Sequence, residues 1–215
     1  MSGMGRMGTL HAWESFGDGV APDLQAVAKG LGGGYVSIGA MLMNHRVASG
    51  LRQGSGFMKH GHTYQSHPIA CAGALAVQKV LKEENLLENA RNMGAVLESQ
   101  LRDQLMGPNS KAKPYVFDIR GGGMFWGVEF EVPEEAKKKM VAKFGPNAQF
   151  AALLNTKCFD NGMIVMAFSG GSNLEGTKGD HLLLAPAYNL TPEQVGEIVR
   201  LTVKSVEEVI ADIEN

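Results

Sequence analysis

In two long stretches of the chain, mostly apolar residues recur at the three- and four-residue spacing of an amphipathic helix. In the first stretch, these positions are Leu86, Ala90, Met93, Leu97, Leu101 and Leu105. In the second, they are Val195, Ile198, Val199, Thr202, Val206, Val209 and Ile210. This periodicity predicts two long helices that each pack one face against a core. Before the second helix, Thr191-Pro192-Glu193-Gln194 has the pattern of a helix start: a capping threonine, a proline, and a glutamine three positions after the threonine.

A third long helix is predicted to begin at Pro68, because the first turn of a helix does not need the N–H that proline lacks. Its apolar positions are Ile69, Ala72, Ala76, Val77 and Val80. We expect these residues to lie on a buried face, with Cys71 on the same face. Shorter helices are predicted over residues 45–52, 133–143 and 150–160.

Short apolar segments typical of strands separate these helices. They cover residues 24–28, 36–43, 115–119, 124–131, 163–168 and 181–185. Gly121-Gly122-Gly123 predicts a hairpin between two of them, and residues 169–180 form a long polar loop with several glycines. The mixed order of strands and helices predicts an α/β protein with two lobes.

Composition narrows the class of protein without naming a function. The 215 residues are 44% hydrophobic and 20% charged, which suits a globular chain of one or two domains. A formal net charge of −2 gives no basic field that would attract nucleic acid or an anionic membrane. The two cysteines are not a disulfide framework, and no apolar run reaches membrane-spanning length. We therefore expect a protein of a reducing compartment, by default the cytoplasm, with no nucleic-acid or membrane partner.

Lys29 is the first candidate for chemistry. It follows an apolar strand-like run and precedes the glycine-rich segment Gly30-Leu31-Gly32-Gly33-Gly34. A free lysine is a poor nucleophile because it is almost fully protonated at neutral pH, but a rigidly held lysine can form a Schiff base with an aldehyde. The glycines would let backbone or a flat ligand approach closely. One lysine beside glycines is also compatible with a solvated lysine at the end of a strand.

Two further patterns resemble a dinucleotide-binding motif and a metal site, but the residues around them do not support either site. Gly3, Gly5 and Gly8 satisfy G-x-G-x-x-G, but no strand precedes them, as dinucleotide binding would require. His60, His62 and His67 are close together, yet no second cluster of metal ligands accompanies them. We therefore expect neither a dinucleotide nor a metal site.

Arg120, next to the glycine hairpin, has two interpretations. It could bind a substrate anion, or it could be a structural arginine that bonds loop carbonyls or a carboxylate. We favour the structural interpretation.

Several motifs together carry a family resemblance. They are Gly3-Met4-Gly5-Arg6-Met7-Gly8-Thr9, Ala12-Trp13-Glu14, Pro22-Asp23, Lys29-Gly30-Leu31-Gly32-Gly33-Gly34, His60-Gly61-His62-Thr63-Tyr64 with His67-Pro68, Arg120-Gly121-Gly122-Gly123-Met124 and Val128-Glu129. In this order and spacing they closely resemble the class III aminotransferases, which are pyridoxal-phosphate enzymes of fold type I. The resemblance covers nearly the whole chain, as the C-terminal half of such an enzyme.

The resemblance implies a fold, a cofactor and two site residues. Residues 1–85 would form part of the large cofactor-binding domain, with a mixed, mostly parallel sheet, and residues 86–215 a linker helix and an α+β small domain. Lys29 would be the catalytic residue and would bind pyridoxal 5′-phosphate as a Schiff base. Thr63 would bind the cofactor phosphate of the partner subunit in a homodimer. The reaction implied is amino-group transfer from an amine or amino acid to a keto acid or aldehyde.

The same resemblance indicates what this stretch of sequence lacks. In the family, an aspartate that pairs with the pyridine nitrogen falls just before Met1, and the N-terminal half also supplies phosphate-binding and ring-stacking groups. Many relatives carry a carboxylate-binding arginine before a Pro-Pro pair, where this chain has leucine within Leu182-Leu183-Leu184-Ala185-Pro186-Ala187. We therefore expect a truncated chain whose substrate the sequence does not name. The alternatives are an inactive aminotransferase-like fragment that acts as an interaction protein, and a related decarboxylase or aminomutase.

Overall fold

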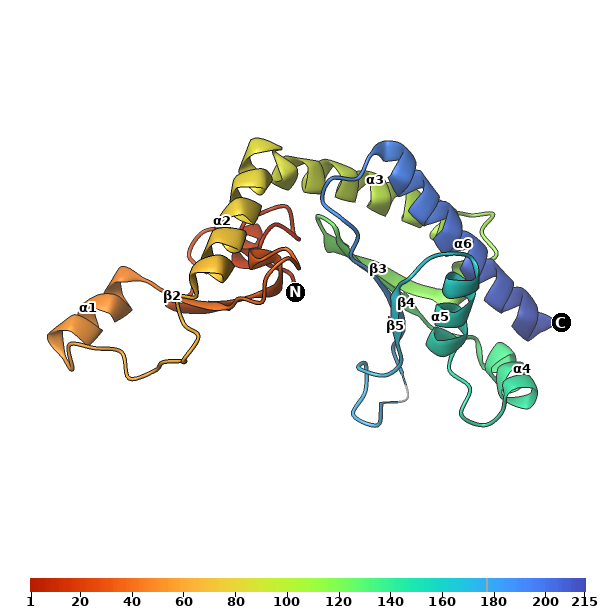
Figure 1. Ribbon diagram of the computed structural model, residues 1–215. Helices are drawn as coiled ribbons and strands as arrows, with labels where there is room; N and C mark the ends of the chain where they lie inside the picture. Colours follow the sequence, from red (N-terminus) through yellow and green to blue (C-terminus); the bar gives the residue numbers. More distant parts are fainter. Residues whose placement is uncertain (177) are drawn as a thin grey trace. The chain divides into compact units, whose positions relative to one another are not determined.

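The structure is a computed structural model, and it describes residues 1–176 and 178–215. Contacts between backbone positions divide the chain into two compact units, Met1–Ala90 and Arg91–Asn215, called here unit 1 and unit 2. Figure 1 shows the elements of both units in chain order. The domain boundary that we predicted after residue 85 and the large- and small-domain roles of the two parts stay predictions.

Unit 1 is built from short elements and one long helix. These are the 3-10 helices η1 (Ala12–Phe16) and η2 (Lys29–Leu31), the strands β1 (Leu24–Val27) and β2 (Ala40–Met43), and the helices α1 (His45–Gln53) and α2 (Pro68–Glu83). The strands pair antiparallel, with Leu24 opposite Met43 and Val27 opposite Ala40. The second strand is shorter than predicted, because residues 32–35 form a glycine-rich turn and pairing starts only at Ala40.

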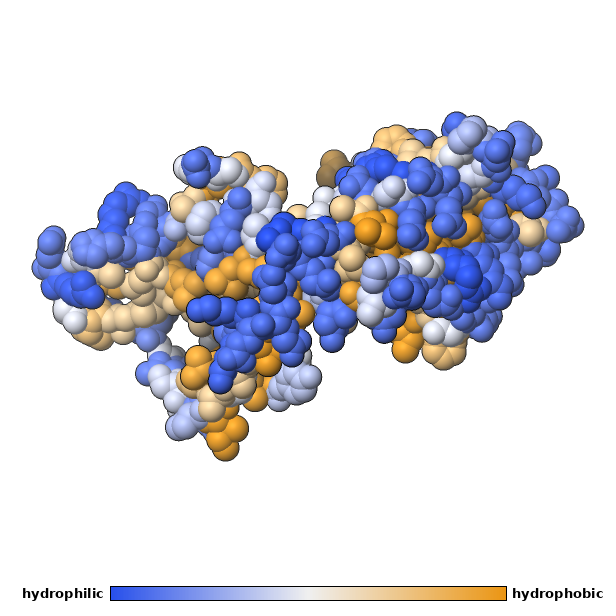
Figure 2. All heavy atoms as spheres, turned by 90° about the horizontal axis from the view of Figure 1, so that it is seen from above, coloured by the Kyte–Doolittle hydropathy of each residue, from blue (hydrophilic) through white to orange (hydrophobic). Residues whose placement is uncertain are grey.

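Unit 1 buries few apolar side chains. The buried ones are Met4, Ala74, Leu81 and Ala90. Many large apolar residues are exposed instead, and Figure 2 shows that hydrophobic side chains reach the molecular surface. Because burial of apolar surface is the main force that stabilises a fold, unit 1 gains little of this stabilisation from its own residues.

Helix α2 corrects one of our predictions. Its buried apolar residues are Ala74 and Leu81, whereas Cys71 is exposed and Ile69 is 72% exposed. The prediction chose the wrong face because this helix is apolar almost all round. Periodicity finds an apolar stripe, but it does not identify which stripe packs when several are available.

Unit 2 contains the four-stranded antiparallel sheet and most of the core. The strands are β3 (Val116–Gly122), β4 (Phe125–Phe130), β5 (Met166–Phe168) and β6 (Asp180–Leu184), in the order β3-β4-β6-β5. The helices are α4 (Glu134–Phe144), α5 (Phe150–Asp160) and α6 (Pro192–Glu214), with η3 (Lys113–Tyr115) before the first strand. The helix α3 (Leu86–Met106) begins in unit 1 and continues through unit 2.

Alternation along the strands of unit 2 sorts the side chains onto two faces. Trp126, Val128 and Phe130 of β4 are buried in the hydrophobic core, together with Leu182 and Leu184 of β6. This core also includes Leu97, Leu101 and Leu105 of α3, as their spacing predicts. Val116 and Ile119 of β3 belong to the same core. Glu129, between Val128 and Phe130, lies on the opposite face of the sheet, because successive side chains of a strand point to opposite sides.

The predicted start of the last helix and the predicted glycine hairpin are both confirmed. The side chain of Thr191 accepts a hydrogen bond from the Gln194 N–H, and the Gln194 side chain accepts one from the Thr191 N–H, so the capping box forms at the start of α6. Strands β3 and β4 pair antiparallel as the predicted glycine hairpin. All strand pairings described for residues 1–176 and 178–215 are antiparallel. The resemblance implied a mostly parallel sheet for residues 1–85, whereas the strands described there, β1 and β2, pair antiparallel because the chain turns back between them.

Candidate active site

Lys29 opens the turn that links β1 to the glycine-rich segment. It is the first residue of η2, directly after Ala28, and its backbone has φ +50°. A positive φ is uncommon for a residue with a side chain, because Cβ then crowds the backbone. Such conformations cost about 1–3 kcal/mol and persist only where the surroundings enforce them. The structure therefore holds this lysine in a defined backbone conformation.

Backbone hydrogen bonds fix the turn that follows. The carbonyl of Lys29 accepts hydrogen bonds from the N–H groups of Gly32 (3.0 Å) and Gly33 (3.1 Å). Gly33 itself has φ +59°, which suits glycine because glycine has no Cβ. The lysine carbonyl is thus tied into the glycine-rich segment.

The side chain of Lys29 is exposed and available. Among residues 1–176 and 178–215, its ammonium makes no hydrogen bond and no ion pair. A primary amine that is exposed, unpaired and carried by a constrained backbone is the donor that an aldehyde cofactor such as pyridoxal phosphate requires. The exposed amine of Lys29 is therefore chemically able to hold a group that bears an aldehyde.

Thr63 lies in a turn just before α2. Its side chain is exposed, and the turn covers residues 63–66. The turn is closed by a hydrogen bond from the Gln65 N–H to the His62 carbonyl (2.9 Å), and Ser66 has φ +57°. Thr63 and Lys29 belong to the same unit. The turn leaves the hydroxyl of Thr63 exposed, as binding of a phosphate would require.

The neighbouring histidines serve this turn and the helix start. Nδ1 of His62 accepts from the Tyr64 N–H (3.1 Å), and Nδ1 of His67 caps α2 by accepting from the Ala70 N–H (3.4 Å). In the part of the chain that the structure describes, no three His, Cys, Asp or Glu side chains come together as metal ligands.

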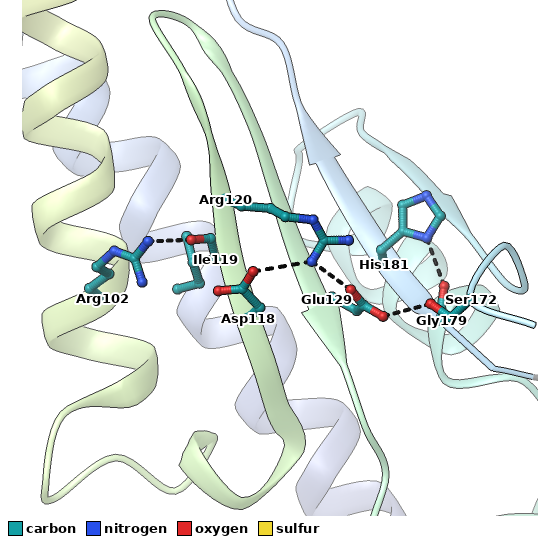
Figure 3. A network of polar contacts seen from close by, with 8 residues as sticks. All are labelled: Arg102, Asp118, Ile119, Arg120, Glu129, Ser172, Gly179 and His181. Carbon is teal, nitrogen blue, oxygen red and sulfur yellow. Dashed lines mark hydrogen bonds and ion pairs between the residues drawn. The ribbon is translucent and has the colours of Figure 1, made fainter.

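Arg120 belongs to a polar network on the sheet of unit 2 (Figure 3). Its Nη1 lies 2.6 Å from Oε2 of Glu129 on β4 and 3.3 Å from Oδ2 of Asp118 on its own strand. Oε1 of Glu129 accepts a hydrogen bond from the Ser172 hydroxyl (2.8 Å), which ties Ser172 to the sheet. These contacts support the structural interpretation of Arg120.

Glu129 was not predicted as a partner of Arg120. Its side chain is only 11% exposed, and burial alone would raise its pKa. The hydrogen bonds from Ser172 and Arg120 outweigh burial and hold the pKa of Glu129 below its ordinary value. The alternation of β4 places Glu129 on the face opposite Val128, and this signal could have revealed the pairing from the sequence.

The helices of the described residues include none that is long and apolar enough to cross a membrane.

Comparison with known proteins identifies the class. The model of the family "Aminotransferase class-III" matches residues 1–174, so the chain belongs to this family. An aminotransferase of Gibberella zeae is 42% identical over 199 residues, covering 93% of this chain and 37% of that protein. An uncharacterized aminotransferase of Schizosaccharomyces pombe is 41% identical, covering 98% of this chain and 43% of that protein.

Solved structures agree on the fold. A transaminase from the marine bacterium Virgibacillus has a TM-score of 0.82 at 26% identity, with coverage of 98% of this chain and 44% of that chain. A transaminase from ancestral reconstruction has a TM-score of 0.79 at 32% identity, with coverage of 98% of this chain and 42% of that chain. The predicted α/β class of the fold type I transaminases is therefore confirmed. The chain spans about two fifths of the length of these relatives.

Proposed function

We propose that this chain takes part in a pyridoxal-phosphate-dependent transamination, in which an amino group passes from an amine or amino acid to a keto acid or aldehyde. The observation that carries the proposal is Lys29, an exposed and unpaired amine on a backbone held at φ +50°. Membership of the class III aminotransferases supports it. When bound, pyridoxal phosphate supplies the aldehyde for the amino group and an aromatic ring that withdraws electrons.

Lys29 has two tasks in this proposal. First, its Nζ would hold the cofactor through the aldehyde carbon, with loss of water, and the fixed backbone would limit where that carbon can lie. Second, its Nζ, when free, would accept the proton of the substrate's amine-bearing carbon and later give it back.

Thr63 completes the proposed cofactor site from across a homodimer. Its exposed hydroxyl and backbone N–H would bind the cofactor phosphate of the partner subunit. The exposed apolar side chains of unit 1 support such an assembly, since Ile69 and Leu75 on α2 are 72% and 71% exposed. Covering them in an interface would supply the apolar burial that unit 1 lacks on its own.

The first amino donor to assay is γ-aminobutyrate. Gamma aminobutyrate transaminase 2 of Solanum lycopersicum is 30% identical over 209 residues, covering 96% of this chain and 41% of that protein. The leucines of β6 stand where many relatives of this class have a carboxylate-binding arginine. The panel should therefore contain γ-aminobutyrate, an α-amino acid and a simple amine. These donors differ in whether they carry a carboxylate and in its distance from the amino group.

Absorbance spectroscopy tests the proposal. The chain is incubated with pyridoxal phosphate, excess cofactor is removed, and each donor is added. A donor-dependent change in the cofactor spectrum, absent in Lys29→Ala, is the expected result. A spectrum that is the same for the chain and for Lys29→Ala would refute the proposal and favour an aminotransferase-like interaction protein.

A further inference from the structure

Val36 lies between two glycines that come from different elements of unit 1. A Cβ added to Gly32, in the turn after Lys29, would lie 2.5 Å from the carbonyl oxygen of Val36. A Cβ added to Gly73, on α2, would lie 2.6 Å from Cγ1 of the same valine. Real Cβ atoms do not approach other atoms this closely, so both positions need glycine.

Two further residues of α2 contact the same turn. The Nε2 of Gln78 donates a hydrogen bond to the carbonyl of Leu31 (3.3 Å), the last residue of η2. The methyl groups of Val77 lie 3.1 and 3.2 Å from the position of a Cβ on Gly33. One face of α2 therefore contacts the segment between Lys29 and Val36 at several points along the helix.

The contacts link Val36 to the lysine through the backbone. Val36 packs on Gly32, and Gly32 donates its N–H to the carbonyl of Lys29 (3.0 Å). A shift of Val36 would therefore move Gly32 and change the backbone of Lys29. Because φ of Lys29 is unfavourable by itself, it depends on such surroundings.

We propose that the Val36–Gly73 contact is a positioning contact for Lys29, in which α2 fixes the backbone that carries the lysine amine. Gly73 and Gln78 are positioning residues, since they act on Lys29 only through the turn. The consequence for cofactor binding rests on the proposed function of Lys29. The effect on the reactivity of the amine does not, because it follows from the packing alone.

Four variants of the full chain test the contact. Gly73→Ala introduces the clash with Cγ1, and Val36→Ala removes the methyl groups that would clash. The double variant Gly73→Ala/Val36→Ala contains both changes, and after Val36→Ala the nearest remaining atom of residue 36 would be Cβ at 3.4 Å, an ordinary contact. Gly50→Ala is the matched control, because Gly50 also lies in a helix of unit 1 but has no atom within 4 Å of an added Cβ.

The readout is the reactivity of individual lysines. In one experiment the chain is treated with pyridoxal phosphate and then borohydride. In a second it is treated with formaldehyde and cyanoborohydride at one fixed pH. In each case the amine condenses with the aldehyde and loses water, and hydride reduces the new carbon–nitrogen double bond. Peptide mass spectrometry gives the labelling of Lys29 relative to Lys79 on α2, which corrects for a general loosening of unit 1.

We expect Gly73→Ala to lower the relative labelling of Lys29 by pyridoxal phosphate about tenfold, since small misplacements of a reacting group have effects of this order or larger. The double variant should return to within about twofold of the original chain, as expected for two coupled residues in contact. Gly50→Ala should leave the ratio unchanged. The relative methylation of Lys29 should change in Gly73→Ala and return in the double variant.

Unchanged Lys29 labelling in Gly73→Ala, or a loss that Val36→Ala does not correct, would overturn the proposal. If Gly73→Ala fails to fold, Gln78→Ala replaces it, because removing the bond to Leu31 introduces no clash, and an unchanged Lys29 ratio in that variant would contradict the positioning role. If the unmodified chain shows no pyridoxal phosphate on Lys29, the proposed function fails. The methylation ratios then still decide whether α2 positions Lys29.

Discussion

Arg120 and Glu129 face each other across neighbouring strands, with Nη1 and Oε2 2.6 Å apart. The carboxylate is nearly buried, whereas the guanidinium is 61% exposed. Glu129 therefore depends on Arg120 and Ser172 for its charge more than Arg120 depends on Glu129. Removing the arginine would leave an incompletely paired carboxylate in the sheet.

We predict that Arg120→Met destabilises the chain by about 1–3 kcal/mol, the range for a hydrogen bond to a charged group that is lost from a buried partner. Chemical denaturation measures the change. Arg200→Met is the matched control, because Arg200 pairs with Glu197 on an exposed helix surface and such pairs contribute about 0–1 kcal/mol. Equal effects of the two variants would show that the Arg120 network contributes no more than a surface pair.

The same network predicts a pH dependence. The pKa of Glu129 is lower in the folded chain than its ordinary value of 4.5, so its ionised form stabilises the fold. This stabilisation is fully present above the ordinary pKa and is lost as the pH falls through the lowered pKa. We expect the stability difference between the chain and Glu129→Gln to be constant near neutral pH and to shrink below about pH 4.5. Denaturation curves at several pH values test this, and a difference that grows on acidification would contradict it.

Close packing of α3 on the β3–β4 hairpin gives a second pair of variants. A Cβ on Gly94 would lie 1.9 Å from the carbonyl oxygen of Gly123, so we expect Gly94→Ala to destabilise the chain by at least about 1–3 kcal/mol. Gly196→Ala on α6 is the control, since the nearest atom to its added Cβ, Oε1 of Gln100, is 4.0 Å away. Alanine is the better helix former there and should stabilise the chain by up to about 1 kcal/mol. Thermal melts of both variants should shift in opposite directions, and a shift in the same direction would be evidence against this packing.

Tyr115 connects the start of the sheet to the end of the chain. Its hydroxyl donates a hydrogen bond to Oε1 of Glu214 (2.6 Å). Burial raises the pKa of Tyr115 above its usual range, and the nearby carboxylate of Glu214 raises it further. Tyr115→Phe should lower the free energy of unfolding by about 1 kcal/mol and loosen the last turn of α6, because the hydrogen bond to Glu214 is lost. Amide hydrogen exchange of residues 211–215 measures the effect, and protection equal to that of the original chain would rule out this role.

Sequence patterns predicted the elements of unit 2 well and those of unit 1 less well. Leu97 and Leu101 lie in the core because α3 packs a single apolar stripe, so its periodicity has only one solution. Cys71 was placed wrongly because several faces of α2 are apolar and contacts in three dimensions decide which one packs. The backbone of Lys29 could not be predicted either, since no local sequence pattern indicates a positive φ at this lysine.

For the site, the sequence identified Lys29 through the glycines that follow it, and its role stays a prediction. Thr63 was identified only through the family resemblance, because a threonine in a turn has no chemical signature of its own. If it binds phosphate across a homodimer, Thr63→Val should weaken pyridoxal phosphate binding about tenfold, because the variant loses the one charge-assisted hydrogen bond that the hydroxyl would donate. Thr156→Val, at an exposed helical threonine in unit 2, is the control. Equal cofactor affinity in both variants would remove Thr63 from the site.

The most direct measurement is to locate the lysine that binds the cofactor. The full chain is incubated with pyridoxal phosphate, reduced with borohydride and digested, and the modified peptides are identified by mass spectrometry beside Lys29→Ala. We predict one dominant adduct on Lys29 that disappears in the variant. Scattered labelling of surface lysines, unchanged in Lys29→Ala, would contradict the proposed role of Lys29 and with it the proposed transaminase function of this chain.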